Sequence, residues 1–593
     1  MNDKQTNTEF DLVVHATHEA GLKLGGIGAV LNGLLSAPTY LEKVKRTILV
    51  GPMNTNDRTE MERLTAPSNK LEILYSSFHR VDGVDEQLSH AFRHIEEMHK
   101  VRLLYGWRAF GAARHEVILV DATAAALDRV NAFKGRLYEV FGIPSDRYES
   151  NPEYNIYVSA AESSYQALKA VVEGEVLPQR FIIAHEFMGL PLAFAAMLED
   201  PGLYRTVFYA HEVATVRPLV EKSPGHDTMF YNVLRRAMEA GLYLEDVFGD
   251  QSAFFKHALI QTAPRCDGIF AVGDLIVDEL HFLGREFAAA DVDLVYNGVP
   301  SFQIDLADKL ASKSKLQQYA QNLLGYWPDY VFTHVTRLIP SKGLWRDIRV
   351  LEHLDGELVK RGKTAILFVL STIIPAGRPA EDIFRMEAEY GWPVVHREGE
   401  PDLVSYEIPF YHAIEAFNQQ SQACKIVLVN QFGWSRDRCG QRMPKDMEFM
   451  DIRKGSDLEF GQSIYEPFGI AQVEPLSFGA LCVVSTACGC VGFLNRASAG
   501  QPPANVIVGD YIGAAPAGDY RQALAIGQAE RDLIEAEEAS RVARQIAATL
   551  PEDEGAMRKL LQDGYELGQR MSWEVVARDY LLPGLRRAAA RRR

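Results

Sequence analysis

The chain has 593 residues, of which 47% are hydrophobic and 24% charged, and its formal net charge is −17 at pH 7. A chain of this length is too long for one ordinary hydrophobic core, so we expect two large domains. The negative surface disfavours nucleic acid and anionic membranes as partners. A neutral substrate is compatible with this charge, and so is an anionic ligand in a locally basic pocket.

The cysteines and the ends of the sequence add further expectations. Six cysteines are scattered without CxxC spacing, so we expect no structural zinc site, redox motif or disulfide framework, and a reducing, cytoplasmic compartment fits. The stretch MNDKQTNTEF lacks the features of a secretory signal, and the longest apolar runs are too short to span a bilayer. The basic tail RRAAARRR, residues 586–593, is expected to be a solvated end.

Short β-like runs alternate with helix-period stretches in the first half of the chain. In chain order the runs are DLVVHAT at residues 11–17, RTILVG, EVILVD, FIIAHE, TVFYAHE and GIFAVG. Strands that alternate with helices predict a parallel sheet covered by helices.

The same pattern restarts after DLVYNGVP, residues 293–300, and continues through YVFTHVTRL, TAILFVLST, KIVLVN and ALCVVST. We therefore predict an α/β protein with two Rossmann-like domains and a boundary near residue 300. The expected parts are an N-terminal domain at 1–300, a linking helix at 301–328, a C-terminal domain at 329–565, and a final helix with the basic tail at 566–593. Two stretches, 70–160 and 395–455, read as irregular insertions. A ligand site is expected beyond the carboxyl ends of the strands.

The first candidate motif is GLKLGGIGAV, residues 21–30. Gly25 and Gly26 would let the backbone approach a ligand closely, and the helix that follows would direct its free N–H groups at an anion. Lys23 adds a positive charge beside them. The dinucleotide fingerprint GxGxxG is not met, because Leu31 occupies its last position. The stretch is either an anion site or a tight structural turn.

The second motif is THVTRLIPSKGLW, residues 333–345, where Arg337 and Lys342 follow a predicted strand. Two cations on one short loop repel each other unless an anion lies between them. Arginine can bind a phosphate with two bonds, while lysine acts as a point charge. The alternative is a pair of solvated surface cations.

The third motif is SIYEPFGIAQVEPLSFGA, residues 463–480, with Glu466 and Glu474 eight residues apart. Pro467 suits the first turn of a helix, and in such a helix Glu474 would lie roughly 12 Å further along the axis. Carboxylate pairs of glycoside hydrolases lie roughly 5–9.5 Å apart, so this spacing better suits two ends of one elongated polar ligand. A solvated helix face with a cap is the alternative.

Together these motifs resemble those of the retaining glycosyltransferases with the GT-B fold, and most of all those of bacterial and plant glycogen or starch synthases. The similarity covers nearly the whole chain. It is carried by KLGGIGAV, FIIAHEFMGLP, FYAHEVA, VYNGVP, TRLIPSKG, IYEPFGIAQVEPLSFGALCVVS and MSWEVVARDY. It implies two Rossmann-like domains facing across a cleft, with a C-terminal helix that crosses back to the N-terminal domain.

The resemblance also implies roles for residues of the C-terminal half. Arg337 and Lys342 would neutralise the diphosphate of a nucleotide sugar. Glu466 would contact hydroxyls of the transferred sugar, and Glu474 would hold the ribose. Further contacts of the sugar would come from the backbone amides of Phe468, Gly469 and Ile470.

In the N-terminal half, the resemblance places Gly25 and Gly26 near the phosphates and the sugar, with Lys23 near the distal phosphate. His211 would line the sugar site, with its backbone carbonyl facing the anomeric carbon. The implied partners are a nucleotide-sugar donor and a glucan or other sugar acceptor, without nucleic acid or membrane.

The implied reaction transfers glucose from ADP- or UDP-glucose to the non-reducing end of an α-1,4-glucan with retention of configuration. Breaking the bond from C1 to the diphosphate builds negative charge on the leaving group, which a preorganised cationic pocket stabilises. No metal ion or other cofactor is expected, because arginine, lysine and helix amides can carry that charge.

Two positions depart from the family pattern. Ala29 stands where the synthases have aspartate, and TACGCVG, residues 486–492, replaces their Thr-Gly-Gly phrase. Cys488 and Cys490 are interpreted as small residues packed near phosphate.

Other functions are compatible with these motifs. They are a transferase with a small acceptor, of the sucrose or trehalose-phosphate synthase type, a GT-B nucleotide-sugar epimerase, and a binding scaffold without activity. An NAD dehydrogenase is disfavoured by the failed fingerprint.

Overall fold

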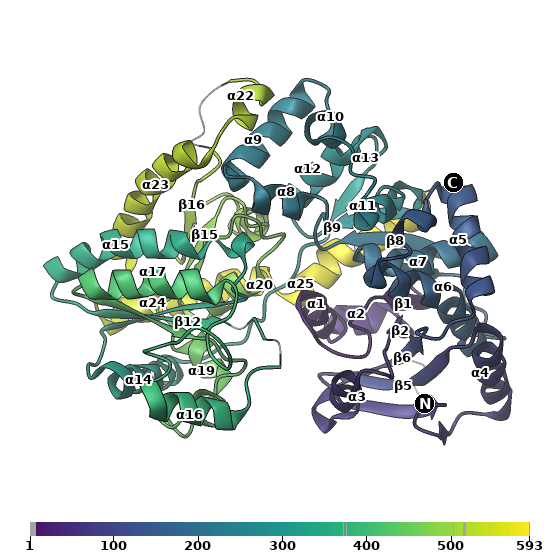
Figure 1. Ribbon diagram of the computed structural model, residues 1–593, viewed down its shortest axis with the longest axis horizontal. Helices are drawn as coiled ribbons and strands as arrows, with labels where there is room; N and C mark the ends of the chain where they lie inside the picture. The colour runs from purple at the N-terminus through teal and green to yellow at the C-terminus, as the bar shows by residue number, and fades with distance from the viewer. Residues whose placement is uncertain (1–7, 372, 375, 502, 514–517, 592–593) are drawn as a thin grey trace. The chain divides into compact units, whose positions relative to one another are not determined.

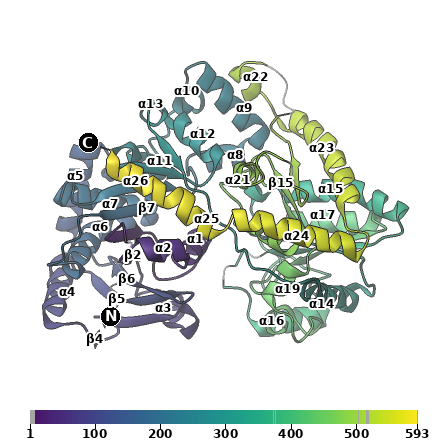
Figure 2. The same ribbon diagram turned by 180° about the vertical axis from the view of Figure 1, so that it is seen from behind.

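The computed structural model describes residues 8–371, 373–374, 376–501, 503–513 and 518–591, which form two compact α/β units (Figures 1 and 2). Unit 1 consists of the described residues of Met1–Thr215, Leu242–Gly298 and Trp573–Arg593. Unit 2 consists of those of Val216–Gly241 and Val299–Ser572. The chain thus passes between the units four times rather than once.

Unit 1 is built on a ten-stranded sheet with the order β10-β9-β8-β7-β1-β2-β6-β5-β3-β4. The strands from β10 to β6 are parallel, and β5, β3 and β4 extend the sheet with antiparallel pairs. Strands β1, β7 and β8 are almost fully buried and rich in Val, Ile and Phe, as expected for strands covered on both faces. The six β-like runs predicted in this half are confirmed as β1, β2, β6, β7, β8 and β9.

The strands of unit 1 are β1 (Leu12–Ala16), β2 (Thr47–Pro52), β3 (Leu71–Ser76), β4 (Val81–Asp82), β5 (Arg102–Phe110), β6 (Ala113–Asp121), β7 (Arg180–His185), β8 (Arg205–Ala210), β9 (Gly268–Ala271) and β10 (Val292–Leu294). Its α-helices are α1 (Gly26–Leu34), α2 (Pro38–Lys43), α3 (Arg58–Thr65), α4 (Glu86–His99), α5 (Leu127–Phe141), α6 (Pro152–Val171), α7 (Glu186–Glu199), α10 (Leu244–Phe248), α11 (Phe255–Ile260), α12 (Asp274–Leu283), α13 (Arg285–Ala288), α25 (Trp573–Val576) and α26 (Leu582–Ala590). Shorter 3-10 turns lie at Pro67–Asn69, Ser145–Tyr148 and Ala263–Arg265, and a π-helical turn at Ala577–Leu581 joins α25 to α26.

The sequence suggested an irregular insertion at 70–160, but the structure shows regular elements there. The stretch contains β6, which pairs in parallel with β2, and the antiparallel β3, β4 and β5 beside it. It also contains the first residues of α6, a long helix whose N-cap Asn151 accepts bonds from the amides of Glu153 and Tyr154. The stretch therefore forms a regular extension of the sheet.

Unit 2 contains a six-stranded, fully parallel sheet with the order β13-β12-β11-β14-β15-β16. Side chains of its strands alternate between two apolar clusters: Phe332 and Leu367 belong to one, Val331 and Ile366 to the other. The first cluster includes residues of α15, α17 and α23, and the second includes residues of α14 and α16. The sheet is thus covered by helices on both faces, as the alternating pattern predicts.

The strands of unit 2 are β11 (Tyr330–Thr336), β12 (Ala365–Ser371), β13 (Cys424–Val429), β14 (Leu458–Gly461), β15 (Leu481–Ser485) and β16 (Val506–Gly509). Its α-helices are α8 (Val216–Lys222), α9 (His226–Glu239), α14 (Leu306–Leu324), α15 (Leu344–Lys360), α16 (Ala380–Tyr390), α17 (Glu407–Gln420), α18 (Arg436–Cys439), α19 (Phe449–Lys454), α20 (Ile470–Val473), α21 (Cys490–Ala497), α22 (Tyr520–Leu524), α23 (Gln528–Thr549) and α24 (Glu554–Arg570). Two 3-10 turns lie at Pro340–Lys342 and Glu474–Phe478.

Residues 216–241 belong to unit 2, although the sequence placed them in the N-terminal domain. Their helix α9 lies beside α22 in both views (Figures 1 and 2). Thr228 Oγ1 donates to the carbonyl of Tyr511 over 2.8 Å, and the carboxylate of Asp227 binds the fully buried guanidinium of Arg346 over 2.7 Å. Burying these polar groups requires their partners, so α9 is held in unit 2.

The segment 301–328 is an integral part of unit 2 and not a linker. The ammonium of Lys309 on α14 is buried and donates to the carbonyls of Ser456 and Phe478 over 2.8 and 2.9 Å. Lys313, one turn further along, forms a buried ion pair with Asp457. Two lysines in the polar sequence of α14 are thus buried and have partners within unit 2.

The stretch 395–455 includes α17 and β13, so only part of it is loop. After Ser572 the chain returns to unit 1, where α26 packs on β8 and β9, so the predicted crossing of the C-terminal helix is confirmed (Figure 2). In the described part of the basic tail, Arg586 pairs with Glu9 and Arg587 with Asp293, so this part is not simply solvated; residues 592–593 lie outside the described residues. Within the described residues, no helix combines the length and apolarity needed to cross a membrane.

Candidate functional site

The predicted site residues of unit 2 follow neighbouring parallel strands. Arg337 comes directly after β11, and Lys342 ends the 3-10 turn that leads into α15. Glu466 follows β14, the strand next to β11. Because the carboxyl ends of parallel strands meet at one edge of the sheet, these residues come together there.

Lys342 and Glu466 form an ion pair at this edge. Both side chains are mostly buried, with exposed fractions of 15% and 14%. The backbone supports the pair, since the amide of Ile464 donates over 2.8 Å to the carbonyl of Ser341 beside Lys342. Gln472 Nε2 lies 3.4 Å from the Glu466 carboxylate. The lysine predicted to bind a diphosphate is therefore held by the glutamate predicted to bind the sugar.

Arg337 differs from Lys342 in its surroundings. Its side chain is exposed, and among the described residues its guanidinium has neither an ion pair nor a hydrogen-bond partner. A second arginine lies near this loop: Arg217 of α8 stacks on the ring of Tyr465, 5.1 Å from its centroid, and its Nη1 is 3.4 Å from Ser341 Oγ. The edge thus carries more positive charge than the sequence motif indicated.

The segment between the two glutamates is less helical than predicted. Helix α20 spans only Ile470–Val473, and Glu474 begins a 3-10 turn. The α-helix stops because Pro475 has no N–H to donate to the preceding turn. The expected axial separation of roughly 12 Å therefore rested on a continuous helix that does not form.

Two glycines allow the chain to fold closely around Glu466. Gly469 adopts a φ of +93°, which side chains other than glycine rarely tolerate. A Cβ at Gly489 would lie 1.8 Å from the carbonyl oxygen of Pro467, so only glycine fits there. The amide of Gly489 donates to the carbonyl of Glu466 over 2.9 Å, and that of Cys490 donates to Phe468 over 2.9 Å. These contacts fix the backbone that carries the acidic motif.

The cysteines of TACGCVG are buried thiols. Cys488 Sγ lies 3.3 Å from the carbonyl of Gly461, and burial raises its pKa to about 11. Burial also raises the pKa of Cys490 well above its ordinary value. Both thiols therefore stay protonated at neutral pH and pack as small side chains.

Glu474 has a partner that the sequence motif did not reveal. The buried guanidinium of Arg453 on α19 lies with Nε 2.9 Å from the Glu474 carboxylate and with Nη1 3.3 Å from Glu459. Neither nitrogen is aligned with these carboxylates as a hydrogen-bond donor, so the contacts are ion pairs rather than hydrogen bonds. Arg453 thus fixes the position of Glu474 by charge.

In unit 1, the glycine loop is held by a carboxylate of the chain itself. The buried Glu19 accepts hydrogen bonds from the amides of Leu24 and Gly25 over 2.5 and 2.7 Å. A Cβ at Gly28 would lie 2.3 Å from the same carboxylate, while a Cβ at Gly26 would meet no atom within 4 Å. The loop is thus a turn held by a carboxylate of the same chain, which fits one of the two alternatives; the anion site for a ligand stays a prediction, and Gly26 and the side chain of Lys23 are exposed.

His211 lies just after β8 and is held through both its backbone and its ring. The buried carboxylate of Glu186 accepts from the amides of His211 and Glu212. Glu186 has a positive φ of 61°, which is uncommon outside glycine and points to a functional constraint. The ring Nε2 of His211 lies 2.8 Å from Nδ1 of His185. The sequence contained a signal for this arrangement, since His185 and His211 each stand at the end of a predicted β-like run and are followed by glutamate.

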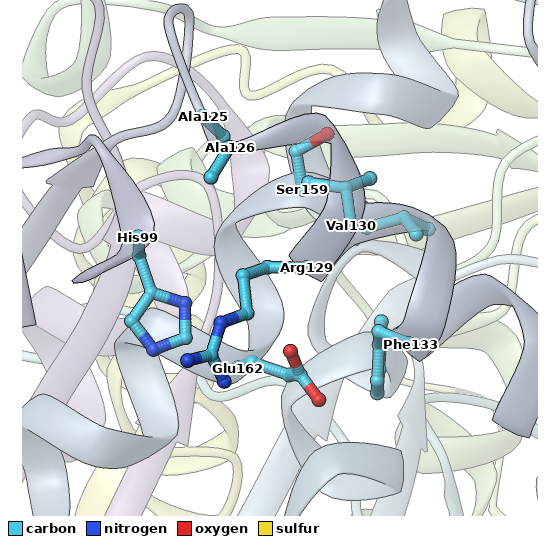
Figure 3. Close-up of a pocket in the computed structure, with 9 residues that line it drawn as sticks. His99, Ala125, Ala126, Arg129, Val130, Phe133, Ser159 and Glu162 are labelled. Carbon is cyan, nitrogen blue, oxygen red and sulfur yellow. The ribbon is translucent and has the colours of Figure 1, made fainter.

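The structure also contains a small pocket elsewhere in unit 1 (Figure 3). It is lined by His99, Ala125, Ala126, Arg129, Val130, Phe133, Val158, Ser159 and Glu162. None of the predicted site residues lies there, so we do not connect this pocket with the motifs.

Comparisons with known proteins agree with this architecture. One similar solved structure is the catalytic domain of starch synthase IV from Arabidopsis thaliana bound to ADP and acarbose, with a TM-score of 0.53 and 13% identity over 98% of this chain and 100% of that chain. Another is the N-terminal domain of a trehalose-6-phosphate phosphatase from Candida albicans, with a TM-score of 0.50 and 11% identity over 99% and 98%. No family model and no curated protein sequence matches the chain.

These similarities, at such low identity, concern the fold. The chain shares its fold with the catalytic domain of a starch synthase, and this is the GT-B fold, with two α/β domains. The predicted fold class is confirmed.

Proposed function

We propose that this chain is a retaining hexosyltransferase that moves glucose from ADP- or UDP-glucose to the non-reducing end of an α-1,4-glucan. The observation that carries the proposal is the ion pair of Lys342 with Glu466, beside the exposed Arg337, at the carboxyl ends of β11 and β14. This edge of a parallel sheet is where α/β proteins of this kind bind their ligands.

The chemistry of the pair suits a nucleotide sugar. The diphosphate would replace Glu466 as the partner of Lys342 and would take the unpaired guanidinium of Arg337 as a second ligand. The released Glu466 carboxylate would then accept hydrogen bonds from hydroxyls of the sugar, next to the amides of Phe468, Gly469 and Ile470. Glu474, held by Arg453, would bind the ribose.

The same groups would lower the barrier of the reaction. As the bond from C1 to the diphosphate breaks, its electron pair stays on the phosphate oxygen, and Lys342 and Arg337 would stabilise the new charge. The acceptor hydroxyl would attack C1 from the face that the phosphate leaves, and its proton would pass to the departing phosphate. This balance accounts for retention without a covalent intermediate, and the proposal uses no metal ion or other cofactor.

Unit 1 would supply the remaining contacts. We propose that Lys23, Gly26 and the amide edge of the glycine loop bind the phosphates and the sugar, and that His211 contacts the sugar. The amide of Gly25 already donates to Glu19, so Gly25 would contribute close approach rather than a free donor.

The test is a panel of nucleotide sugars offered with glycogen, maltooligosaccharides or simple sugars, with nucleotide release and products measured after treatment with a chelator. We expect glucose transfer to glucan from ADP- or UDP-glucose. Transfer to a simple sugar instead would indicate a small-acceptor synthase, and an epimerised sugar without acceptor would indicate an epimerase. No turnover of any nucleotide sugar would contradict the proposal.

A further inference from the structure

Three histidines of unit 1 form one hydrogen-bonded chain that ends at His211. Nδ1 of His15 lies 2.8 Å from Nε2 of His185, and Nδ1 of His185 lies 2.8 Å from Nε2 of His211. In the other direction, Nε2 of His15 lies 3.1 Å from the hydroxyl of Tyr40, which lies 2.9 Å from the hydroxyl of Thr47. Five side chains are thus linked in series.

The sheet brings these histidines together. Strands β1, β7 and β8 are neighbours in the parallel sheet, His15 pairs with Ile183 near the end of β7, and His185 pairs with Tyr209 near the end of β8. His211 follows β8 by one residue. The three rings therefore lie side by side at the carboxyl ends of three adjacent strands.

The rings stay neutral at neutral pH. His15 and His185 are fully buried, and burial lowers the pKa of both well below the ordinary value. Burial likewise lowers the pKa of His211 to about 3. A neutral imidazole has one donor and one acceptor nitrogen, so all hydrogen bonds of the chain must run in the same direction.

The far end of the chain selects that direction. If the Thr47 hydroxyl donates to Tyr40 and Tyr40 donates to His15, every buried donor of the chain has an acceptor. In the reverse direction Tyr40 donates to Thr47, and the hydroxyl hydrogen of Thr47 has no acceptor. Among the described residues, Tyr40 is the only hydrogen-bond partner of Thr47 Oγ1. Thr47 is buried, so an unused donor there is unfavourable.

We propose that this series of hydrogen bonds fixes the tautomer of His211: Nε2 accepts from His185, and Nδ1 carries the proton. Nδ1 has no hydrogen-bond partner among the described residues, so it presents a donor for an oxygen atom of a ligand. His185, His15 and Tyr40 are then positioning residues for His211. The identity of that ligand as a nucleotide sugar rests on the function proposed above.

The first test reads the tautomer directly in the ligand-free, full-length protein. Histidine is labelled with ¹⁵N, long-range ¹H–¹⁵N spectra are recorded at pH 7, and a His211→Gln variant identifies the His211 signals. We expect a proton on Nδ1 and none on Nε2. A proton on Nε2 would overturn the inference, and this outcome does not depend on whether the protein transfers sugar.

The second test substitutes His185, the residue that donates to His211. His185→Leu removes the donor to His211, so we expect a mixture of His211 tautomers and a kcat about 10-fold lower, the value of one hydrogen bond. His185→Asn can place an amide donor near the position of Nδ1, so it should keep the tautomer and most of the kcat. Wild-type kcat in His185→Leu would overturn the positioning role.

A matched control separates this effect from general destabilisation. His257→Leu removes another buried imidazole of unit 1, whose ring nitrogens lie 3.0 and 3.1 Å from side-chain atoms of Thr215 and Gln261, outside the series of five linked side chains. It should leave the His211 tautomer unchanged; a change equal to that in His185→Leu would overturn the inference. If His185→Leu does not fold, the spectra of the unmodified protein still decide the tautomer.

Discussion

The two units hold their candidate ligand-contacting groups in different ways. In unit 1, buried carboxylates bind pairs of consecutive amides: Glu19 binds those of Leu24 and Gly25, and Glu186 binds those of His211 and Glu212. In unit 2, the corresponding groups are charged side chains: Lys342 pairs with Glu466, Glu474 pairs with Arg453, and Arg337 is exposed. Unit 1 thus fixes backbone before any ligand arrives, whereas unit 2 offers charges whose partners can be exchanged.

The difference has a physical consequence. A buried carboxylate that binds two backbone amides cannot be removed without taking away the acceptor of both, so changes in unit 1 should affect stability first. The charged groups proposed to bind the donor in unit 2 can take a ligand as a new partner, so changes in unit 2 should affect turnover first. The four predictions below test this contrast.

The largest expected effect is on turnover when the pair in unit 2 is broken. Lys342→Ala, or Glu466→Ala, should lower kcat by about 10²–10³, because one stabilising group of the transition state is lost. Steady-state kinetics on the best donor would measure it, with circular dichroism to verify the fold. Lys360→Ala, which removes an exposed lysine of the same unit, is the control. Near-normal rates in both variants would contradict the site assignment.

The second effect is a loss of stability of unit 1 in acid. The unfolded chain binds protons at His15, His185 and His211 below about pH 6.5, whereas burial keeps these rings neutral in the folded state. Stability is therefore fully present above pH 6.5 and falls as the pH drops towards 3, the approximate folded pKa of His211. Each ring contributes at most about 1.4 kcal/mol per pH unit.

Chemical unfolding at pH 7, 6 and 5 would measure this loss. Neighbouring His115 and His18 also have lowered pKa values and contribute to the same slope, so the wild-type slope alone is not assigned to the chain. The difference between wild type and His185→Asn isolates one ring. An equal slope in the two proteins would show that His185 is not held neutral by folding.

The third effect concerns the glycine loop. Glu19→Ala removes the acceptor for two amides and should destabilise the protein by about 1.5–3 kcal/mol, the value of hydrogen bonds to a charged group. Urea unfolding would measure it. Glu19→Gln keeps an acceptor and should lose less, and Glu62→Ala, at an exposed surface pair, should change stability by no more than about 0.5 kcal/mol. Wild-type stability in Glu19→Ala would mean that water replaces the carboxylate without cost.

The smallest effect is expected at Arg337. Arg337→Lys keeps the charge but loses the two-pronged contact with a phosphate, so the KM for the nucleotide sugar should rise about 10-fold while the unfolding midpoint stays unchanged. Thermal unfolding and donor titrations measure the two quantities. Arg558→Lys, an exchange on an exposed helix of the same unit, is the control. A lower melting temperature without a change in KM would reverse the contrast between the units.

Some of the site followed from local sequence and some did not. The spacing of Arg337 and Lys342 after a strand, and the glycines and glutamates of the acidic motif, could be recognised because each motif is local. Arg453 and Glu19 were missed. Arg453 contacts Glu474 from a separate helix, and Glu19 precedes the loop whose amides it binds without forming a recognisable pattern. The continuous helix expected between Glu466 and Glu474 does not form, because Pro475 ends it.

The sequence by itself determined the architecture of the chain: alternating strands and helices require parallel sheets, and parallel sheets put strand ends, with their polar residues, at one edge. Only the tertiary structure decided which of these residues meet. Lys342 and Glu466 are 124 residues apart, His15 and His185 are 170 apart, and the segment 216–241 joins unit 2. The physical reason is that periodicity and propensity act over a few residues, whereas ion pairs and hydrogen bonds between distant residues form only when the packed sheets bring those residues together.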